Sequence, residues 1–240
     1  MLKYRRKMLT IMVVTTVLGI PAFIINLFDA PGSFHSIIIR YWAQLLLWLN
    51  GIKVEVEKPE NLQAANPAVI IINHESALDI AMVLAALPVP VRFMAKKELF
   101  AMPIFGWELR LGGHIAIDRV QRKRALTAIE KYSPAIVREK QNIAVSPEGT
   151  RTKDGKIGPF KKGAFHLAER FDIPLIPVTI LGAADLVPVR KRAILPGTAR
   201  LMIDPPVKTT DFADLDACIE AVRNRMIEHK ERYEVEKLSS

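Results

Sequence analysis

From about residue 53 onward, short apolar runs alternate with amphipathic stretches, and this alternation constrains the fold more than any other feature. It is typical of an α/β domain, in which helices cover the faces of a sheet. Strands are predicted at 53–57, 68–72, 91–95, 114–117, 143–146, 175–180 and 199–203, and helices at 76–87, 121–140, 161–171 and 211–235.

An uncharged apolar run at 8–28 precedes this domain and follows the basic stretch 3–7. Its length suits a bilayer, which takes about 20 apolar residues. Pro21 lies within the run and is expected to bend or break a helix there. No A-x-A-like cleavage site follows the run, so the sequence predicts a retained anchor and not a signal peptide.

A second N-terminal helix is predicted over residues 34–50. Its apolar face, with two tryptophans, resembles that of a helix lying in a membrane interface. Alternatively, this helix only packs on the domain. Residues 1–52 are thus predicted to form a two-helix membrane anchor, followed by one domain over 53–240, on the cytoplasmic face of the inner (plasma) membrane. The apolar face of the helix at 34–50 consists of Ile38, Tyr41, Trp42, Leu45, Trp48 and Leu49, and the other side of this helix carries Ser36, Arg40 and Gln44.

The charge balance narrows the possible partners. Lys and Arg number 34 against 25 acidic residues, a net charge of +9, which attracts anionic lipid, phosphorylated substrates, nucleic acid or an acidic carrier protein. A nucleic-acid binder is disfavoured because the basic residues lack interleaved aromatics and no recognition motif is present. The single cysteine, Cys218, excludes an internal disulfide, and the histidines show no zinc spacing.

His74 follows the predicted strand at 68–72, at the carboxyl end where sites in α/β sheets usually form. On one continuous helix, His74 and Asp79 would diverge by about 140°, so they can meet only if His74 precedes the helix. A neutral imidazole can accept a hydroxyl proton, and a carboxylate on its other nitrogen fixes the tautomer. The same residues also fit a capping box with Ser76 as N-cap and Asp79 at N3.

A second polar segment, Glu148 to Arg151, follows the predicted strand at 143–146. Gly149 lets the backbone approach an anion closely, and Arg151 can hold a phosphate with two hydrogen bonds. Glu148 is interpreted as accepting from a substrate hydroxyl or bracing the basic residues, with Thr150 beside it. The alternative is an ordinary turn.

Further cations are predicted beside these segments. Lys96 and Lys97 follow one predicted strand and Arg119 follows another, which places them at the same edge of the sheet as His74 and Arg151. A histidine base surrounded by cations indicates proton abstraction beside a phosphate-bearing substrate. Alternatively, Arg119 forms only a surface ion pair with the aspartate that precedes it.

Four blocks of the sequence resemble the motifs of the glycerolipid acyltransferase family, specifically the 1-acyl-glycerol-3-phosphate acyltransferases. NHESALD at 73–79 is similar to the first motif, and residues 97–119 are similar to the second. PEGTR at 147–151 is similar to the third and IPLIPV at 173–178 to the fourth. The blocks occur in the family's order, and together they are far more specific than any one of them.

The resemblance implies a single mixed-sheet α/β acyltransferase domain flanked by helices, with no metal or other cofactor. The implied reaction moves an acyl chain from acyl-CoA or acyl-carrier protein to the sn-2 hydroxyl of lysophosphatidic acid, giving phosphatidic acid for phospholipid biosynthesis. Other acceptors stay open: glycerol 3-phosphate, another lysophospholipid or a lyso-ornithine lipid. A non-catalytic basic membrane-binding protein is a further alternative. The resemblance assigns catalysis to His74 and Asp79, and acceptor binding to Arg119, Glu148, Gly149, Thr150 and Arg151.

Overall fold

The structure is a computed structural model of the 240-residue chain. It describes residues 2–29, 33–103, 105–118, 127, 131, 134, 138–151, 155–188 and 193–239.

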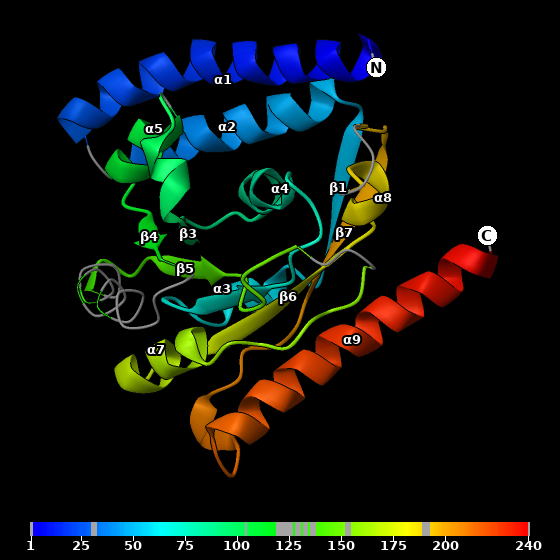
Figure 1. Ribbon diagram of the computed structural model, residues 1–240. Helices are drawn as coiled ribbons and strands as arrows, with labels where there is room; N and C mark the ends of the chain where they lie inside the picture. Colours follow the sequence, from blue (N-terminus) through cyan, green and yellow to red (C-terminus); the bar gives the residue numbers. More distant parts are fainter. Residues whose placement is uncertain are drawn as a thin grey trace.

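Within these residues, one seven-stranded sheet has the order β1-β7-β6-β2-β5-β3-β4 (Figure 1). Neighbouring strands are parallel except for β6 and β7, which are antiparallel, so the predicted mixed sheet is confirmed. Each predicted strand is present, with ends within two residues of the prediction. The strands are β1 Ile52–Glu57, β2 Val69–Ile72, β3 Val91–Lys96, β4 Ile115–Ile117, β5 Asn142–Val145, β6 Leu175–Leu181 and β7 Gly197–Ile203.

The central strand β2 is buried on both faces, as expected for a short apolar run inside a parallel array. Ile70 and Ile72 pack into one hydrophobic cluster, whereas Val69 and Ile71 pack into another on the opposite face. Because β2, β3, β4, β5 and β6 run in the same direction, their carboxyl ends meet at one edge of the sheet. This edge receives the segments that follow them.

Helices cover both faces of the sheet (Figure 1). The helix at 76–87 is confirmed but begins later than predicted, and those at 161–171 and 211–235 are confirmed with shifted ends. The helix predicted at 121–140 falls largely outside the described residues. On one face lie α4 Asp79–Ala86 and α5 Phe105–Leu111, and on the other α7 Gly163–Phe171 and α9 Leu215–Ser239; the short elements are α3 Glu60–Gln63, η1 Lys97–Ala101, α8 Ala183–Leu186 and η2 Thr209–Asp211.

Two N-terminal helices, α1 Leu2–Asp29 and α2 Ser33–Leu49, form an outer layer over α4 and α5 (Figure 1). The break expected at Pro21 does not occur, because α1 continues through this residue. Proline removes one intrahelical hydrogen bond, and packing of α1 against α2 and α5 holds the helix together. Among the described residues, none of the helices is long and apolar enough to cross a membrane.

The second helix packs on the domain with one face and exposes another. Ala43, Leu46 and Leu47 are buried in the core cluster that contains α4, so one face of this helix packs on the domain, while a membrane contact through its other face stays a prediction. Tyr41 and Trp48, from the face predicted to be apolar, are 66% and 72% exposed. Packing therefore leaves a large aromatic surface uncovered.

Candidate active site

The segment that follows β2 is tied firmly to the neighbouring strand β6. Asn73 is 1% exposed, and its Oδ1 accepts a hydrogen bond from the Ile180 N–H at 2.7 Å. Its Nδ2 donates to the Ile180 carbonyl at 2.9 Å. The side-chain amide of Asn73 thus makes the same two hydrogen bonds with β6 that a backbone N–H and C=O would make. These bonds fix the position at which the chain leaves the sheet.

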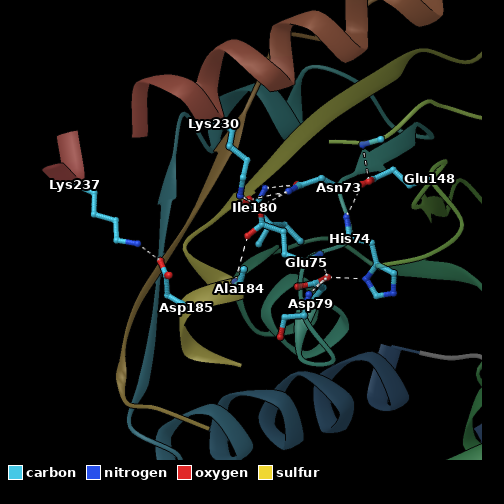
Figure 2. Close-up of polar contacts among 12 residues, drawn as sticks. Asn73, His74, Glu75, Asp79, Glu148, Ile180, Ala184, Asp185, Lys230 and Lys237 are labelled. Carbon is cyan, nitrogen blue, oxygen red and sulfur yellow. Dashed lines mark hydrogen bonds and ion pairs between the residues drawn. The ribbon is translucent and has the colours of Figure 1, made fainter. Parts of the chain in front are cut away.

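His74 and Asp79 meet as the sequence predicts (Figure 2). The His74 Nδ1 lies 2.8 Å from the Asp79 Oδ2, and Asp79 is the first residue of α4. The same oxygen accepts the Glu75 and Ser76 N–H groups, each at 2.9 Å. Because the Asp79 Oδ2 already accepts two N–H groups, it also acts as an acceptor toward the imidazole. The His74 Nδ1 is therefore the donor and carries the ring proton. The Nε2 of His74 is then left as a proton acceptor.

The capping interpretation holds only in part. The N-cap of α4 is Leu78 and not Ser76, so the predicted capping box is wrong. The Ser76 Oγ instead accepts the Leu78 N–H at 3.0 Å and closes a tight turn ahead of the helix. Asp79 nevertheless accepts the Ser76 N–H, so the carboxylate organises the turn and orients the imidazole at once.

Burial dominates the electrostatics of Asp79. The side chain is 1% exposed, and its Oδ1 has no hydrogen-bond partner among the described residues. Burial therefore raises the pKa of Asp79, although hydrogen bonds from His74 and Ser76 and the positive charge of Arg151 act to lower it.

Glu148 makes contacts that the sequence interpretation did not include (Figure 2). Its Oε1 accepts the His74 N–H at 2.9 Å, and its Oε2 accepts the Gly158 N–H at 3.0 Å. The residue is 8% exposed, and burial raises the pKa of its carboxyl group. Glu148 therefore joins the end of β5 to the backbone of His74, while a contact with the acceptor stays a prediction.

The next residues form an open, cationic rim. Gly149 has φ +75°, a backbone conformation that favours glycine, and a Cβ placed there would lie 2.8 Å from the mobile end of Lys161, its Nζ. Thr150 and Arg151 are exposed. The ammonium of Lys161 thus lies against the backbone of the predicted anion-binding segment.

Lys96 ends β3 and Lys97 follows it at the predicted edge, and both contact acidic side chains. The Lys97 Nζ lies 2.7 Å from Asp118, and the Lys96 Nζ lies 3.7 Å from Glu98. Both lysines are about half exposed, so both ammonium groups remain accessible to solvent. Arg119 lies outside the described residues.

Two residues of the site were not recognised in the sequence. Glu75 is 2% exposed, although it lies in the turn between His74 and Asp79, and it contacts Lys230 of α9. The signal in the sequence that could have identified Glu75 was the presence of an acidic residue between His74 and Asp79. Lys230 is separated from Glu75 by 155 residues, and no motif joins the two.

An apolar pocket lies between the N-terminal helices and the helices of the domain. Ile80 and Leu84 of α4, the helix that begins with Asp79, line it. Across the pocket, α1 and α2 contribute Leu18, Ile38 and Trp42. In the part of the chain that the structure describes, no group of three or more His, Cys, Asp or Glu side chains could hold a metal ion.

A buried aspartate that orients a histidine at the carboxyl edge of an α/β sheet defines a candidate general-base site. The family model described as Acyltransferase matches residues 53–181, more than half of the chain, and the chain therefore belongs to this acyltransferase family.

Named relatives agree with this family. The chain is 33% identical over 221 residues to a chloroplastic 1-acyl-sn-glycerol-3-phosphate acyltransferase of Brassica napus, covering 91% of this chain and 62% of that protein. It is 31% identical over 191 residues to the human 1-acyl-sn-glycerol-3-phosphate acyltransferase beta, covering 79% and 69% of the two chains. The chain thus spans less than two thirds of the length of the Brassica relative.

A solved structure shares the fold. The crystal structure of the 1-acyl-sn-glycerophosphate acyltransferase from Thermotoga maritima superposes with a TM-score of 0.78 at 24% sequence identity. The match covers 96% of this chain and 97% of the other, so both N-terminal helices and the sheet belong to the common architecture.

Proposed function

We propose that the protein transfers an acyl chain from an acyl thioester to the sn-2 hydroxyl of 1-acyl-glycerol 3-phosphate, giving phosphatidic acid. The observation that carries the proposal is the 2.8 Å contact between His74 and Asp79, which leaves Nε2 as the acceptor for a hydroxyl proton. The names of the relatives support this acceptor class. The donor is either acyl-CoA or acyl-carrier protein.

The proposed reaction uses the free ring nitrogen of His74. The Nε2 of His74 removes the proton of the acceptor hydroxyl, while Asp79 stabilises the imidazolium that forms. The alkoxide oxygen attacks the thioester carbonyl, a new C–O ester bond forms and the C–S bond breaks. The departing thiolate takes up the proton held by His74, so the imidazole returns to its starting state. No acyl-enzyme is needed, because the acceptor itself is the nucleophile.

Cations beside the site are proposed to hold the acceptor phosphate. Arg151 is exposed and lies three residues after Glu148, whose side chain contacts the His74 backbone. A phosphate bound here would hold the hydroxyl within about 3 Å of His74, and such positioning is a large part of catalysis. Arg119, Lys96 and Lys97 are proposed to contribute charge at the same rim.

The apolar pocket beside α4 is proposed to receive an acyl chain. Its lining is almost wholly apolar and includes Ile80 and Leu84 of α4, the helix that begins with Asp79. Burial of each methylene group contributes about 0.8 kcal/mol, so a fatty chain gains substantially from such a pocket.

The outer layer, residues 1–52, is proposed to bind the cytoplasmic face of the membrane in which the lipid substrate resides. Large apolar side chains of α1 and α2 that the domain does not cover support this proposal, since such surfaces mark contact with a partner or a membrane. They are Leu9, Met12, Val13, Val17, Ile20, Ile24, Ile37, Tyr41, Leu45, Trp48 and Leu49.

An acceptor panel tests the proposed reaction. Purified protein is assayed with lysophosphatidic acid, glycerol 3-phosphate, other lysophospholipids and a lyso-ornithine lipid, each with matched acyl-CoA and acyl-carrier-protein donors. Phosphatidic acid formed fastest from lysophosphatidic acid is the expected result. Equal or faster acylation of another acceptor would reassign the substrate, and lipid binding without ester formation would favour the non-catalytic alternative.

A matched pair of leucine variants tests membrane binding. Leu9→Ser on α1 removes a 59% exposed leucine, and Leu238→Ser on α9 removes an 88% exposed one. In flotation with vesicles containing anionic lipid, Leu9→Ser is expected to weaken binding about fivefold or more, as expected for loss of one apolar contact. Leu238→Ser is expected to bind like the unmodified protein, and equal effects of the two changes would contradict the assignment of this surface.

A further inference from the structure

The last helix of the chain sends a lysine into the domain. The buried stripe of α9 includes Val222 and Met226, and Lys230 occupies the next position at helical i,i+4 spacing. Its side chain is 12% exposed, so the ammonium lies where another apolar residue would continue the stripe. Burial lowers the pKa of Lys230 to about 8, which leaves the ammonium charged at neutral pH.

The partner of this lysine is Glu75, the residue that follows His74 (Figure 2). The Lys230 Nζ contacts the Glu75 Oε1, which also accepts a hydrogen bond from Asn73 Nδ2 at 3.1 Å. The other carboxylate oxygen accepts the Ala184 N–H at 3.3 Å. Glu75 is 2% exposed, and a buried carboxylate without a partner is strongly unfavourable, so Lys230 keeps Glu75 in place.

The main chain of Glu75 leads from this ion pair to the catalytic residues. Its N–H donates to the Asp79 Oδ2 at 2.9 Å, and that oxygen also accepts from His74. The side chain of Glu75 is therefore held by α9, whereas its backbone helps to hold the carboxylate that orients the imidazole. A movement of Glu75 toward solvent would pull an N–H away from Asp79.

We infer that the Lys230–Glu75 ion pair positions the catalytic turn, so that α9 takes part in acyl transfer through a positioning residue that never touches the substrate. The inference rests on the proposed function for its kinetic test, and it adds a long-range requirement to the local His74–Asp79 motif.

A matched lysine on the same helix provides the control. Lys237 lies seven residues after Lys230, and therefore on nearly the same side of α9, and its Nζ lies 2.6 Å from Asp185. This side chain is 46% exposed, so its ion pair is solvated and its loss leaves no buried charge. Figure 2 shows the two pairs side by side, one beside the turn and one at the periphery.

The kinetic experiment compares Lys230→Met with Lys237→Met in the full-length protein. Lys230→Met is expected to lower kcat about tenfold or more with both KM values within about twofold, because only the positioning of the turn is lost. Lys237→Met is expected to keep kcat within about twofold. An unchanged kcat in Lys230→Met, or equal losses in the two variants, would overturn the inference.

A double substitution shows whether Lys230 acts through Glu75. Glutamine at position 75 keeps an acceptor for Ala184 but carries no charge, so Glu75→Gln combined with Lys230→Met removes the unpaired buried carboxylate. The double variant is expected to recover most of the kcat lost in Lys230→Met, as coupled residues do in a double-mutant cycle. It also supplies the test if Lys230→Met does not fold. A folded double variant as impaired as His74→Ala, or no better than a folded Lys230→Met, would contradict the inference.

A readout without turnover separates this inference from the proposed reaction. In histidine-labelled protein, the His74 ring nitrogen resonances, assigned with His74→Ala, are expected to shift in Lys230→Met and not in Lys237→Met. If the protein acylates no lysophosphatidic acid but these shifts occur, the proposed acceptor fails and the positioning role stands. Unchanged His74 resonances in a folded Lys230→Met would remove the positioning role whatever the substrate.

Discussion

In the turn at 73–79, the side chains of Asn73, Ser76 and Asp79 are at most 1% exposed, whereas Thr150 and Arg151 at the neighbouring strand end lie open to solvent. The turn is held by β6, α4 and α9, and its polar groups bond mainly to the protein itself. The open segment carries cations whose partners can exchange with water or substrate.

Because of this difference in burial, the two regions are expected to have different roles in the reaction. A buried, hydrogen-bonded turn is pre-organised, so it can hold an imidazole in one tautomer and one orientation throughout the reaction. An exposed arginine binds phosphate without first breaking buried contacts. Changes in the buried turn are therefore expected to lower kcat, and changes in the open segment are expected to raise KM.

The largest effect is expected from the base itself. His74→Ala removes the group that accepts the hydroxyl proton, and kcat is expected to fall about 10³-fold, as for loss of a general base. Circular dichroism and vesicle flotation should be unchanged. His166→Ala, at an exposed histidine on α7, is the control and should retain full activity. Near-normal acyl transfer by purified His74→Ala would refute the mechanism.

A smaller and kinetically distinct effect is expected in the open segment. Arg151→Ala should raise the KM for lysophosphatidic acid about tenfold with little change in kcat, because the lost contact binds the phosphate in the ground and transition states alike. Arg232→Ala, which removes an exposed arginine on α9, controls for the change in net charge. A raised donor KM with an unchanged acceptor KM would assign Arg151 to the thioester side.

Much of the fold could be predicted because its elements are locally encoded. Most strands contain a short apolar run, whereas β1 alternates apolar and charged residues, and β2, buried on both faces, could be recognised from its four consecutive apolar residues. The antiparallel pairing of β6 with β7 was not specified by local pattern, because it depends on the path of the whole chain. The start of α4 moved from Ser76 to Asp79 because Ser76 bonds to Leu78 within the preceding turn.

The site was predictable where its residues are close in sequence. His74 and Asp79 are five residues apart, and a strand followed by a helix brings them together. Glu148 was found but interpreted as a substrate ligand, because its approach to the His74 backbone depends on the pairing of β2 with β5. The Lys230–Glu75 pair joins positions 155 residues apart, and one lysine in a helical stripe was too weak a pattern to reveal it.

The smallest expected effect is the pH dependence of folding stability that comes from Glu148, the second buried carboxylate. It tests whether Glu148 behaves like the buried turn or like a group that is already ionised. Burial raises its pKa in the folded protein, so the folded state binds the proton more tightly than the unfolded chain does. Stability from this group is therefore present at low pH and is lost as the pH rises above 4.5, the ordinary pKa of a glutamate side chain, toward the raised pKa of the folded state. Glu148→Gln cannot ionise and lacks this loss.

Chemical denaturation of both proteins between pH 4 and pH 8 measures the difference. The free energy of unfolding of the unmodified protein, relative to Glu148→Gln, should decrease as the pH rises, with a slope of at most about 1.4 kcal/mol per pH unit for one proton. Glu231→Gln, at an exposed position on α9, should show no such trend. A relative stability that increases with pH would mean that hydrogen bonds from His74 and Gly158 outweigh burial, and Glu148 would then belong with the pre-ionised groups of the site.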